Sequence, residues 1–518
     1  MNNHLKETMR TLIIPLSILL IISAFFSFYN LKSAPPGLYP DEAMDGTNAL
    51  QVIAGAGPQV FFPQNGGREG LFMDIQAVAL VVFGQREPWV LRSVSGIFGI
   101  LVVLGIFLFV REFLLAVEQK ASALMARRAT YIAFVAAFFA ATSFWLIDFS
   151  RIGFRAIMAP AFLVWALWAL IKAWRGTTGW RRYAYAIAGG VIYGLGMYSY
   201  IAYRVTPLLI VVLFLLFYKT YKTARKKTKV IFGIFVLAAF MTALPLAMYF
   251  IGHPADFFGR TSEISIFSSA SSWQGELMGN IGKTAGMLIF SGDMNWRHNI
   301  AGAPELYWPI AVFFCIGILA GTASVISWRV KKKIGLWQGF DMFFVFMCVW
   351  LVCAFAPVVF SNEGIPHALR SILMIPAAFS IAGIGAYAVY RFVRRYISVR
   401  VVSACGAVLG VGLLLHAYGT YFIVWAQNPA VADAFNARSV AIARTIQNIP
   451  HSIPVYVVAH ESGVDVDGIP VSAQTVMFMT DTYDTALQQQ KNIHYVTEAD
   501  EKNIPADAVV FYLQEEGN

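Results

Sequence analysis

Apolar runs of close to twenty residues recur along the whole chain. An α-helix needs about twenty apolar residues to cross a bilayer, and only 13% of the 518 residues are charged, about half the share found in globular domains. The sequence therefore predicts an α-helical polytopic membrane protein with about eleven transmembrane helices. We place the spans at 11–31, 88–110, 129–148, 156–174, 183–200, 204–218, 230–251, 306–327, 340–360, 371–390 and 400–425.

The lysine and arginine residues predict the orientation of these spans. Most of the 39 basic residues gather in short segments on one side of the spans, as expected for cytoplasmic loops. The net charge of +10 therefore indicates membrane orientation rather than nucleic-acid binding. We expect a multi-pass plasma-membrane protein with a cytoplasmic N-terminus. Residues 1–425 would form the transmembrane module, with outer segments at 32–87 and 252–305, and residues 426–518 a small extracytoplasmic α/β domain.

The stretch GLYPDEAMDG follows the first span and contains Asp41, Glu42 and Asp45. The prolines before it end the first helix, so Asp41 falls at an expected N-cap, with a helix from Glu42 to about Ile53. Glu42 in the first turn suits the helix dipole. A carboxylate on the outer face of an apolar chain is equally a candidate proton acceptor. The sequence leaves helix capping and proton transfer both open for Asp41.

More ionisable side chains lie beside apolar spans on the same predicted face. Such groups are costly near a membrane and are functional candidates, and the arginine fork matches a phosphate. Plainer alternatives are a local Asp148–Arg151 salt bridge and side chains that extend individually to the membrane interface. The candidate substrate-binding residues are Arg68, Glu69, Arg151, Arg155, Arg204, Arg297, His298, His367 and Arg370.

Acids and arginines on one outer face suit glycosyl transfer from a polyprenyl phosphate. Arginines would stabilise the charge that develops on the leaving lipid phosphate, and a carboxylate would take the proton of the acceptor hydroxyl. The chain has no glycine-rich phosphate loop, which fits a donor other than a nucleotide sugar.

Four motifs carry a family resemblance: YPDEA, DFSRIGFRA, GDMNWRHN and PHALRS. With this topology, the chain resembles GT-C fold glycosyltransferases that use polyprenyl-phosphate sugars, the group of protein O-mannosyltransferases and lipid A aminoarabinose transferases (glycosyltransferase family 39-like). The resemblance covers most of the membrane part. It implies that Asp41 is the base or orients the acceptor, with Glu42 beside it, and that Asp148 is a second acid near the site. NGGREGLFMD stands where many relatives have a Lys-Pro-Pro-Leu-like motif, so either Arg68 replaces the lysine or the donor headgroup differs.

The cofactor and the alternatives stay open at this point. Some relatives use a divalent metal near the first-loop acid; Asp41, Asp148 and His298 could ligate one, but the sequence does not decide it. The expected partners are a polyprenyl-phosphate-linked sugar donor, a glycan, lipid or protein acceptor, and membrane lipid, without nucleic acid. The alternatives are a transporter or flippase for a polyprenyl-linked sugar, which should show repeat symmetry, and a non-catalytic binder of such lipids.

Overall fold

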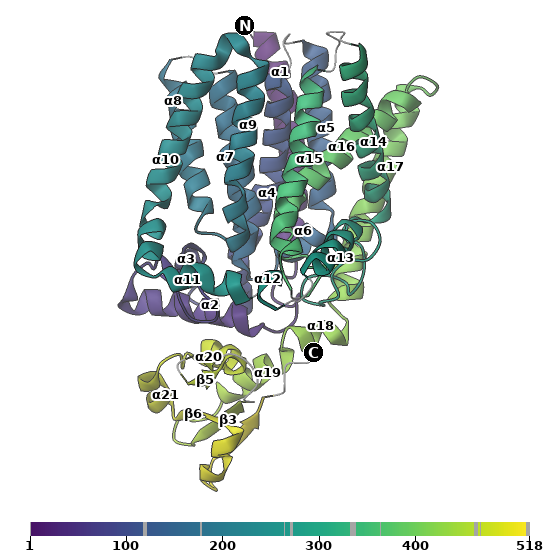
Figure 1. Ribbon diagram of the computed structural model, residues 1–518. Coiled ribbons are helices and arrows are strands. Elements are labelled where there is room, and N and C mark those ends of the chain that lie inside the picture. Colours follow the sequence, from purple (N-terminus) through teal and green to yellow (C-terminus); the bar gives the residue numbers. More distant parts are fainter. Residues whose placement is uncertain are drawn as a thin grey trace.

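Long helices that run side by side form the larger part of the molecule (Figure 1). The computed structural model describes residues 2–117, 122–176, 179–263, 265–269, 273–331, 338–362, 364–459, 465–466 and 468–513. The long helices are α1 (Asn2–Phe28), α4 (Pro88–Val117), α5 (Ala123–Ala141), α7 (Met158–Arg175), α8 (Trp180–Gly196), α9 (Pro207–Thr220), α10 (Arg225–Gly252), α14 (Trp308–Lys331), α15 (Gln338–Val359), α16 (Ile375–Val393) and α17 (Val399–Tyr418).

These helices confirm the prediction of a polytopic helical membrane protein. Within the described residues, nine helical segments are long and apolar enough to cross a membrane. The other two predicted spans fall on α1, whose apolar part is Leu12–Phe28, and on α8, which has 17 residues. The apolar stretch of α16 is 83% buried and that of α17 only 11%, so α16 lies inside the bundle and α17 faces outward.

The end of the third predicted span differs from the structure, and the difference positions Asp148. The span predicted at 129–148 ends at Ala141, and a separate short helix α6 (Phe144–Phe149) follows. The break occurs because Ser143 caps the new helix: its hydroxyl accepts a hydrogen bond of 3.2 Å from the Leu146 amide. Asp148 therefore lies on α6, beyond the end of α5.

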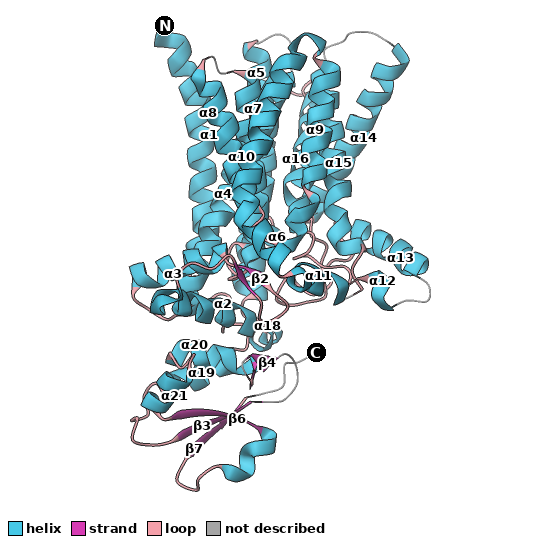
Figure 2. Cartoon of the chain, turned by 60° about the vertical axis from the view of Figure 1, so that its left-hand side comes forward, coloured by secondary structure: helices cyan, strands magenta, loops and turns pink. Residues whose placement is uncertain are grey.

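The two outer segments lie at the same end of the bundle as α6 (Figure 2). We call this layer the platform. The first segment contributes a two-stranded hairpin that pairs Phe61 with Glu69 and Phe62 with Arg68. The elements of the platform are α2 (Pro40–Gln51), β1 (Phe61–Phe62), β2 (Arg68–Glu69), α3 (Leu71–Phe83), α11 (Pro254–Glu263), α12 (Ile266–Ser269) and α13 (Trp273–Gly286).

The C-terminal region is a small α/β unit, as predicted. Its three-stranded sheet has the order β6-β3-β7, and β3 pairs in parallel with both neighbours. The elements are α18 (Pro429–Ala434), α19 (Ala437–Ile446), β3 (Val455–Ala459), β4 (Asp465–Val466), β5 (Ile469–Pro470), α20 (Gln474–Thr480), α21 (Thr485–Lys491), β6 (Ile493–Thr497) and β7 (Val509–Tyr512).

Helix α20 packs this unit against the platform (Figure 1). The Thr475 hydroxyl donates a hydrogen bond of 2.8 Å to the Leu38 carbonyl, just before α2. At Gly46 in α2, a Cβ atom would come within 2.7 Å of both Leu91 and Phe478. Only glycine allows this close approach, so α2 lies between the membrane bundle and the C-terminal unit.

Candidate functional site

Helix α2 presents Asp41 at its first turn without using it as a cap. Pro40 is the first helical residue and Tyr39 the N-cap, and the Tyr39 amide donates a hydrogen bond of 3.2 Å to Glu42 Oε2. The capping alternative for Asp41 is therefore not seen, because proline at the first position starts the helix earlier. The half-buried Asp41 carboxylate instead accepts a hydrogen bond of 2.8 Å from Asn65 Nδ2.

Glu42 lies in the first turn of α2, and its side chain is fully buried. Arg92, at the start of α4, donates from Nε to Glu42 Oε1 and from Nη2 to Glu42 Oε2, each at 2.9 Å. The same guanidinium donates to the Pro35 and Gly37 carbonyls at 2.7 and 3.0 Å. Arg92 thus fixes the start of the platform to the bundle. Sequence reasoning did not single it out, although an arginine near the start of an apolar span was a usable signal.

Asp45 and Arg68 form a buried ion pair next to Asp41. Arg68 also donates a hydrogen bond of 2.6 Å to Asn48 Oδ1. Burial raises the pKa of Asp45 to about 6, although the guanidinium partner favours the charged carboxylate. The Asp45 carboxylate therefore loses its negative charge as the pH falls through about 6, while Arg68 stays positive.

Glu69 holds two arginines on the other side of the hairpin. Arg155 Nε lies 3.3 Å from Glu69 Oε2, and Arg204 Nη2 lies 3.6 Å from Glu69 Oε1. Arg204 also donates to the Phe257 carbonyl at 3.0 Å. One carboxylate thus faces two guanidinium groups, and their remaining N–H donors can bind an anionic ligand.

These groups surround one cavity of about 160 Å³. Seven of the predicted site residues line it, and they come from α2, the hairpin and segments before α7, α9 and α16. Asp45, Asn65, Tyr200 and Asp256 also line it, and the sequence had not proposed them as ligand contacts. The seven predicted residues are Asp41, Arg68, Glu69, Arg155, Arg204, His367 and Arg370.

Arg151 and Asp148 are buried away from the lining of this cavity. Arg151 donates to three backbone carbonyls at and just beyond the end of α1, those of Phe26, Tyr29 and Ala34, at 2.6 to 2.8 Å. Asp148 is fully buried, and neither of its carboxylate oxygens has a hydrogen-bond partner among the described residues. The alternative of a local Asp148–Arg151 salt bridge is not seen, because the Arg151 guanidinium points to these carbonyls.

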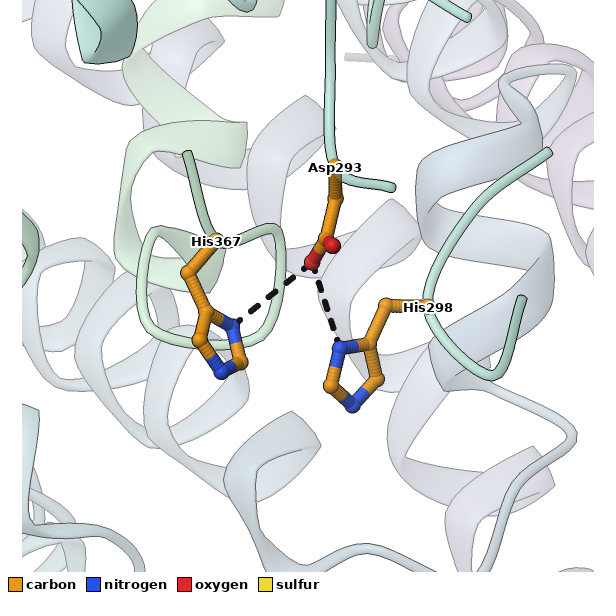
Figure 3. A group of neighbouring side chains, drawn as sticks. All are labelled: Asp293, His298 and His367. Carbon is orange, nitrogen blue, oxygen red and sulfur yellow. Dashed lines mark hydrogen bonds and ion pairs between the residues drawn. The ribbon is translucent and has the colours of Figure 1, made fainter. Parts of the chain in front are cut away.

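His298 and His367 meet at Asp293, in the loops before α14 and α16 (Figure 3). Asp293 Oδ2 lies 3.2 Å from His298 Nδ1 and 3.7 Å from His367 Nδ1. Burial lowers the pKa of His367 well below its ordinary value, which favours the neutral imidazole. Within the described residues, these three side chains form a group that could hold a metal ion. Of the three ligands proposed from the sequence, His298 belongs to this group.

Two further predicted arginines lie near these loops. The Arg297 guanidinium lies over the Tyr39 ring at 3.8 Å, directly before α2. Arg370 Nη1 donates a hydrogen bond to the Ser361 hydroxyl.

Comparison with solved structures identifies the class of fold. The chain is similar to the oligosaccharyltransferase AglB from Archaeoglobus fulgidus in complex with an inhibitory peptide and a dolichol-phosphate, with a TM-score of 0.50 and 14% identity over 95% of this chain and 70% of the archaeal one. The Archaeoglobus fulgidus oligosaccharyltransferase in complex with Zn and sulfate is similar with a TM-score of 0.49 and 14% identity, over 93% of this chain and 62% of that chain. The S. cerevisiae protein O-mannosyltransferase Pmt1-Pmt2 complex bound to the sugar donor has a TM-score of 0.37 and 15% identity, over 47% of this chain and 34% of that chain.

No family model and no curated protein sequence matches the chain. At 14% identity, the match to AglB defines the fold. The protein therefore has a GT-C-like fold, that of membrane glycosyltransferases, with a C-terminal α/β unit, as the sequence predicted.

Proposed function

We propose that the protein transfers a sugar from a polyprenyl-phosphate-linked donor to an acceptor on the extracytoplasmic face of the plasma membrane. Residues 1–425 would be the catalytic module, with a cytoplasmic N-terminus, and residues 426–518 an extracytoplasmic domain. The observation that carries the proposal is the platform cavity, in which the Asp41 carboxylate lies in one lining with four arginines. The dolichol-phosphate in the archaeal structure of similar fold supports a lipid phosphate as the donor group.

Five residues of the cavity have roles in this proposal. Asp41 takes the proton from the acceptor hydroxyl as general base. Arg155, Arg204 and Arg370 bind the lipid phosphate and stabilise the charge it gains as the bond to the sugar breaks. Glu69 orients the first two of these arginines, because both contact its carboxylate.

Other predicted site residues act through the position of the platform. Glu42 and its partner Arg92 hold α2 against α4. Arg151 holds the end of α1 through three carbonyls. We assign Glu42 and Arg151 positioning roles. Asp148 stays a candidate second acid and Arg297 a candidate substrate contact.

The test is Asp41→Asn in the purified protein, assayed with a panel of polyprenyl-phosphate-linked sugars. We expect loss of transfer with donor affinity within about threefold of wild type, because the amide keeps the shape but cannot accept the proton. Asp433→Asn is the control, since Asp433 is exposed on α18, away from the platform cavity. Near-normal turnover in Asp41→Asn would contradict the base assignment.

The two alternatives predict different results in the same preparation. A transporter or flippase would move the lipid-linked sugar between vesicle leaflets without forming a product. A non-catalytic binder would bind the donor equally well before and after Asp41→Asn and release no lipid phosphate.

A further inference from the structure

Backbone contacts hold Asp293 in one orientation between the two histidines. Its Oδ1 accepts a hydrogen bond of 2.8 Å from the Asn295 amide. Its Oδ2 accepts another of 2.8 Å from the Ala368 amide, in the loop that carries His367. The carboxylate therefore joins the two loops and directs Oδ2 toward both imidazole rings (Figure 3).

Hydrogen bonding explains only one of the two histidine contacts. The 3.2 Å from Asp293 Oδ2 to His298 Nδ1 allows a hydrogen bond, but the 3.7 Å to His367 Nδ1 is too long for one. His367 Nδ1 is buried and has no hydrogen-bond partner among the described residues. Ligand atoms on a tetrahedral ion, with bonds of about 2.0–2.1 Å, lie roughly 3.3–3.4 Å apart. The observed 3.2 and 3.7 Å lie close to this separation, so one ion could bind all three side chains after a small shift of the His367 ring.

A buried glutamate lies beside the same group. Glu305 is 3% exposed, and its Oε1 lies 3.5 Å from the Asp293 amide nitrogen. Its Oε2 is buried and has no hydrogen-bond partner among the described residues. Buried carboxylates of this kind are stable when a cation balances them.

We propose that Asp293, His298 and His367 bind one divalent first-row transition-metal ion of the Zn²⁺ type. Two imidazole nitrogens and one carboxylate oxygen suit such ions, whereas Mg²⁺ and Ca²⁺ prefer oxygen ligands. Three protein ligands also leave one coordination position open. His367 lines the platform cavity, so the ion would lie at the wall of that cavity. Metal binding is independent of the proposed sugar transfer and can be tested without it.

The experiment measures metal binding to the purified, full-length protein after treatment with a chelator. We expect one Zn²⁺ or Co²⁺ per chain, bound Co²⁺ with the visible absorption of a low-symmetry site, and no displacement by a hundredfold excess of Mg²⁺. His298→Gln and His367→Gln should each weaken Zn²⁺ binding by at least about 100-fold, because each removes a ligand. His494→Gln is the control, since His494 lies on β6 and contacts Asn492.

Unfolding temperatures of the metal-free proteins separate lost ligands from lost folding. The proposal expects metal-free wild type and His367→Gln to unfold at similar temperatures, and Zn²⁺ to stabilise only the wild type. The proposal is overturned if wild type binds less than a tenth of an equivalent of Zn²⁺, or if His367→Gln keeps wild-type affinity within threefold. If His298→Gln does not fold, the result for His367→Gln decides.

Discussion

The buried ion pair of Glu42 and Arg92 provides a sharp test of how the platform is held. Arg92→Met removes both hydrogen bonds to Glu42 and those to the Pro35 and Gly37 carbonyls, while keeping an unbranched apolar side chain. Glu42 then keeps only the backbone donors at Tyr39 and Gly153 among its described hydrogen bonds.

The size of the effect follows from the burial of the pair. The side chains of Arg92 and Glu42 are 1% and 0% exposed, so the remaining carboxylate cannot reach water. Breaking such a pair on one side costs about 3–5 kcal/mol. Replacing both partners removes the unpaired charge, so Arg92→Met combined with Glu42→Gln should recover at least about 2 kcal/mol of this loss.

The free energy of unfolding is measured by SDS titration in mixed bicelles, together with the rate of sugar transfer. Arg86→Met is the matched control, because Arg86 pairs with Asp481 at 3.1 Å but is 46% exposed. We expect a loss of at most about 1 kcal/mol for this exposed pair. A loss below about 1 kcal/mol for Arg92→Met, or a double variant that simply adds the two single effects, would refute the reasoning.

Three further predictions concern the cavity and the C-terminal unit. Asp45 loses its charge as the pH falls through about 6. We therefore expect the affinity for the anionic donor, measured by calorimetry, to rise about tenfold from pH 7.5 to pH 5 in the wild type and to stay level in Asp45→Asn. Parallel pH profiles of the wild type and Asp45→Asn would contradict this. Arg155→Gln should weaken donor binding at least about tenfold with little change in stability, because Arg155 lines the cavity beside Glu69. Arg151→Gln should lower the unfolding temperature and leave donor affinity nearly unchanged, because Arg151 contacts backbone carbonyls. Equal losses of donor affinity in the two variants would contradict these separate roles. Gly46→Val should cost about 1–3 kcal/mol and expose the C-terminal unit to limited proteolysis, because its Cβ would clash with Phe478; wild-type protection would count against that packing.

Much of the architecture is predictable because it depends on properties of short stretches of the sequence. A membrane span must be apolar over about twenty residues, and basic residues mark its cytoplasmic side. These two rules assign residues as distant in sequence as Asp41 and Arg370 to one face, and both line the same cavity. The helix break at Ser143 between α5 and α6 is harder to predict from the sequence, because its only signal is one capping hydroxyl within a continuing apolar pattern.

The partners of individual charged groups were not predictable in this way. Arg151 and Arg155 are one helical turn apart in sequence, yet Arg151 binds carbonyls near the end of α1 and Arg155 binds Glu69 in the cavity. A guanidinium can donate hydrogen bonds to a carbonyl, a carboxylate or a phosphate. Only the tertiary structure decides among them. The pairing of Glu42 with Arg92, fifty residues away, depends on the packing of α2 against α4 in the same way.

The position of α2 between two parts of the chain has a consequence for biosynthesis. Ala43, Ala49 and Leu50 of α2 share an apolar core with Val476 and Phe478 of α20. The ribosome makes α2 among the first elements and α20 more than four hundred residues later. Until α20 has been made and, in the proposed orientation, has crossed the membrane, this face of α2 has no partner from the C-terminal unit. We therefore expect Asp41 to reach its final position late, so that a nascent chain is inactive for most of its synthesis.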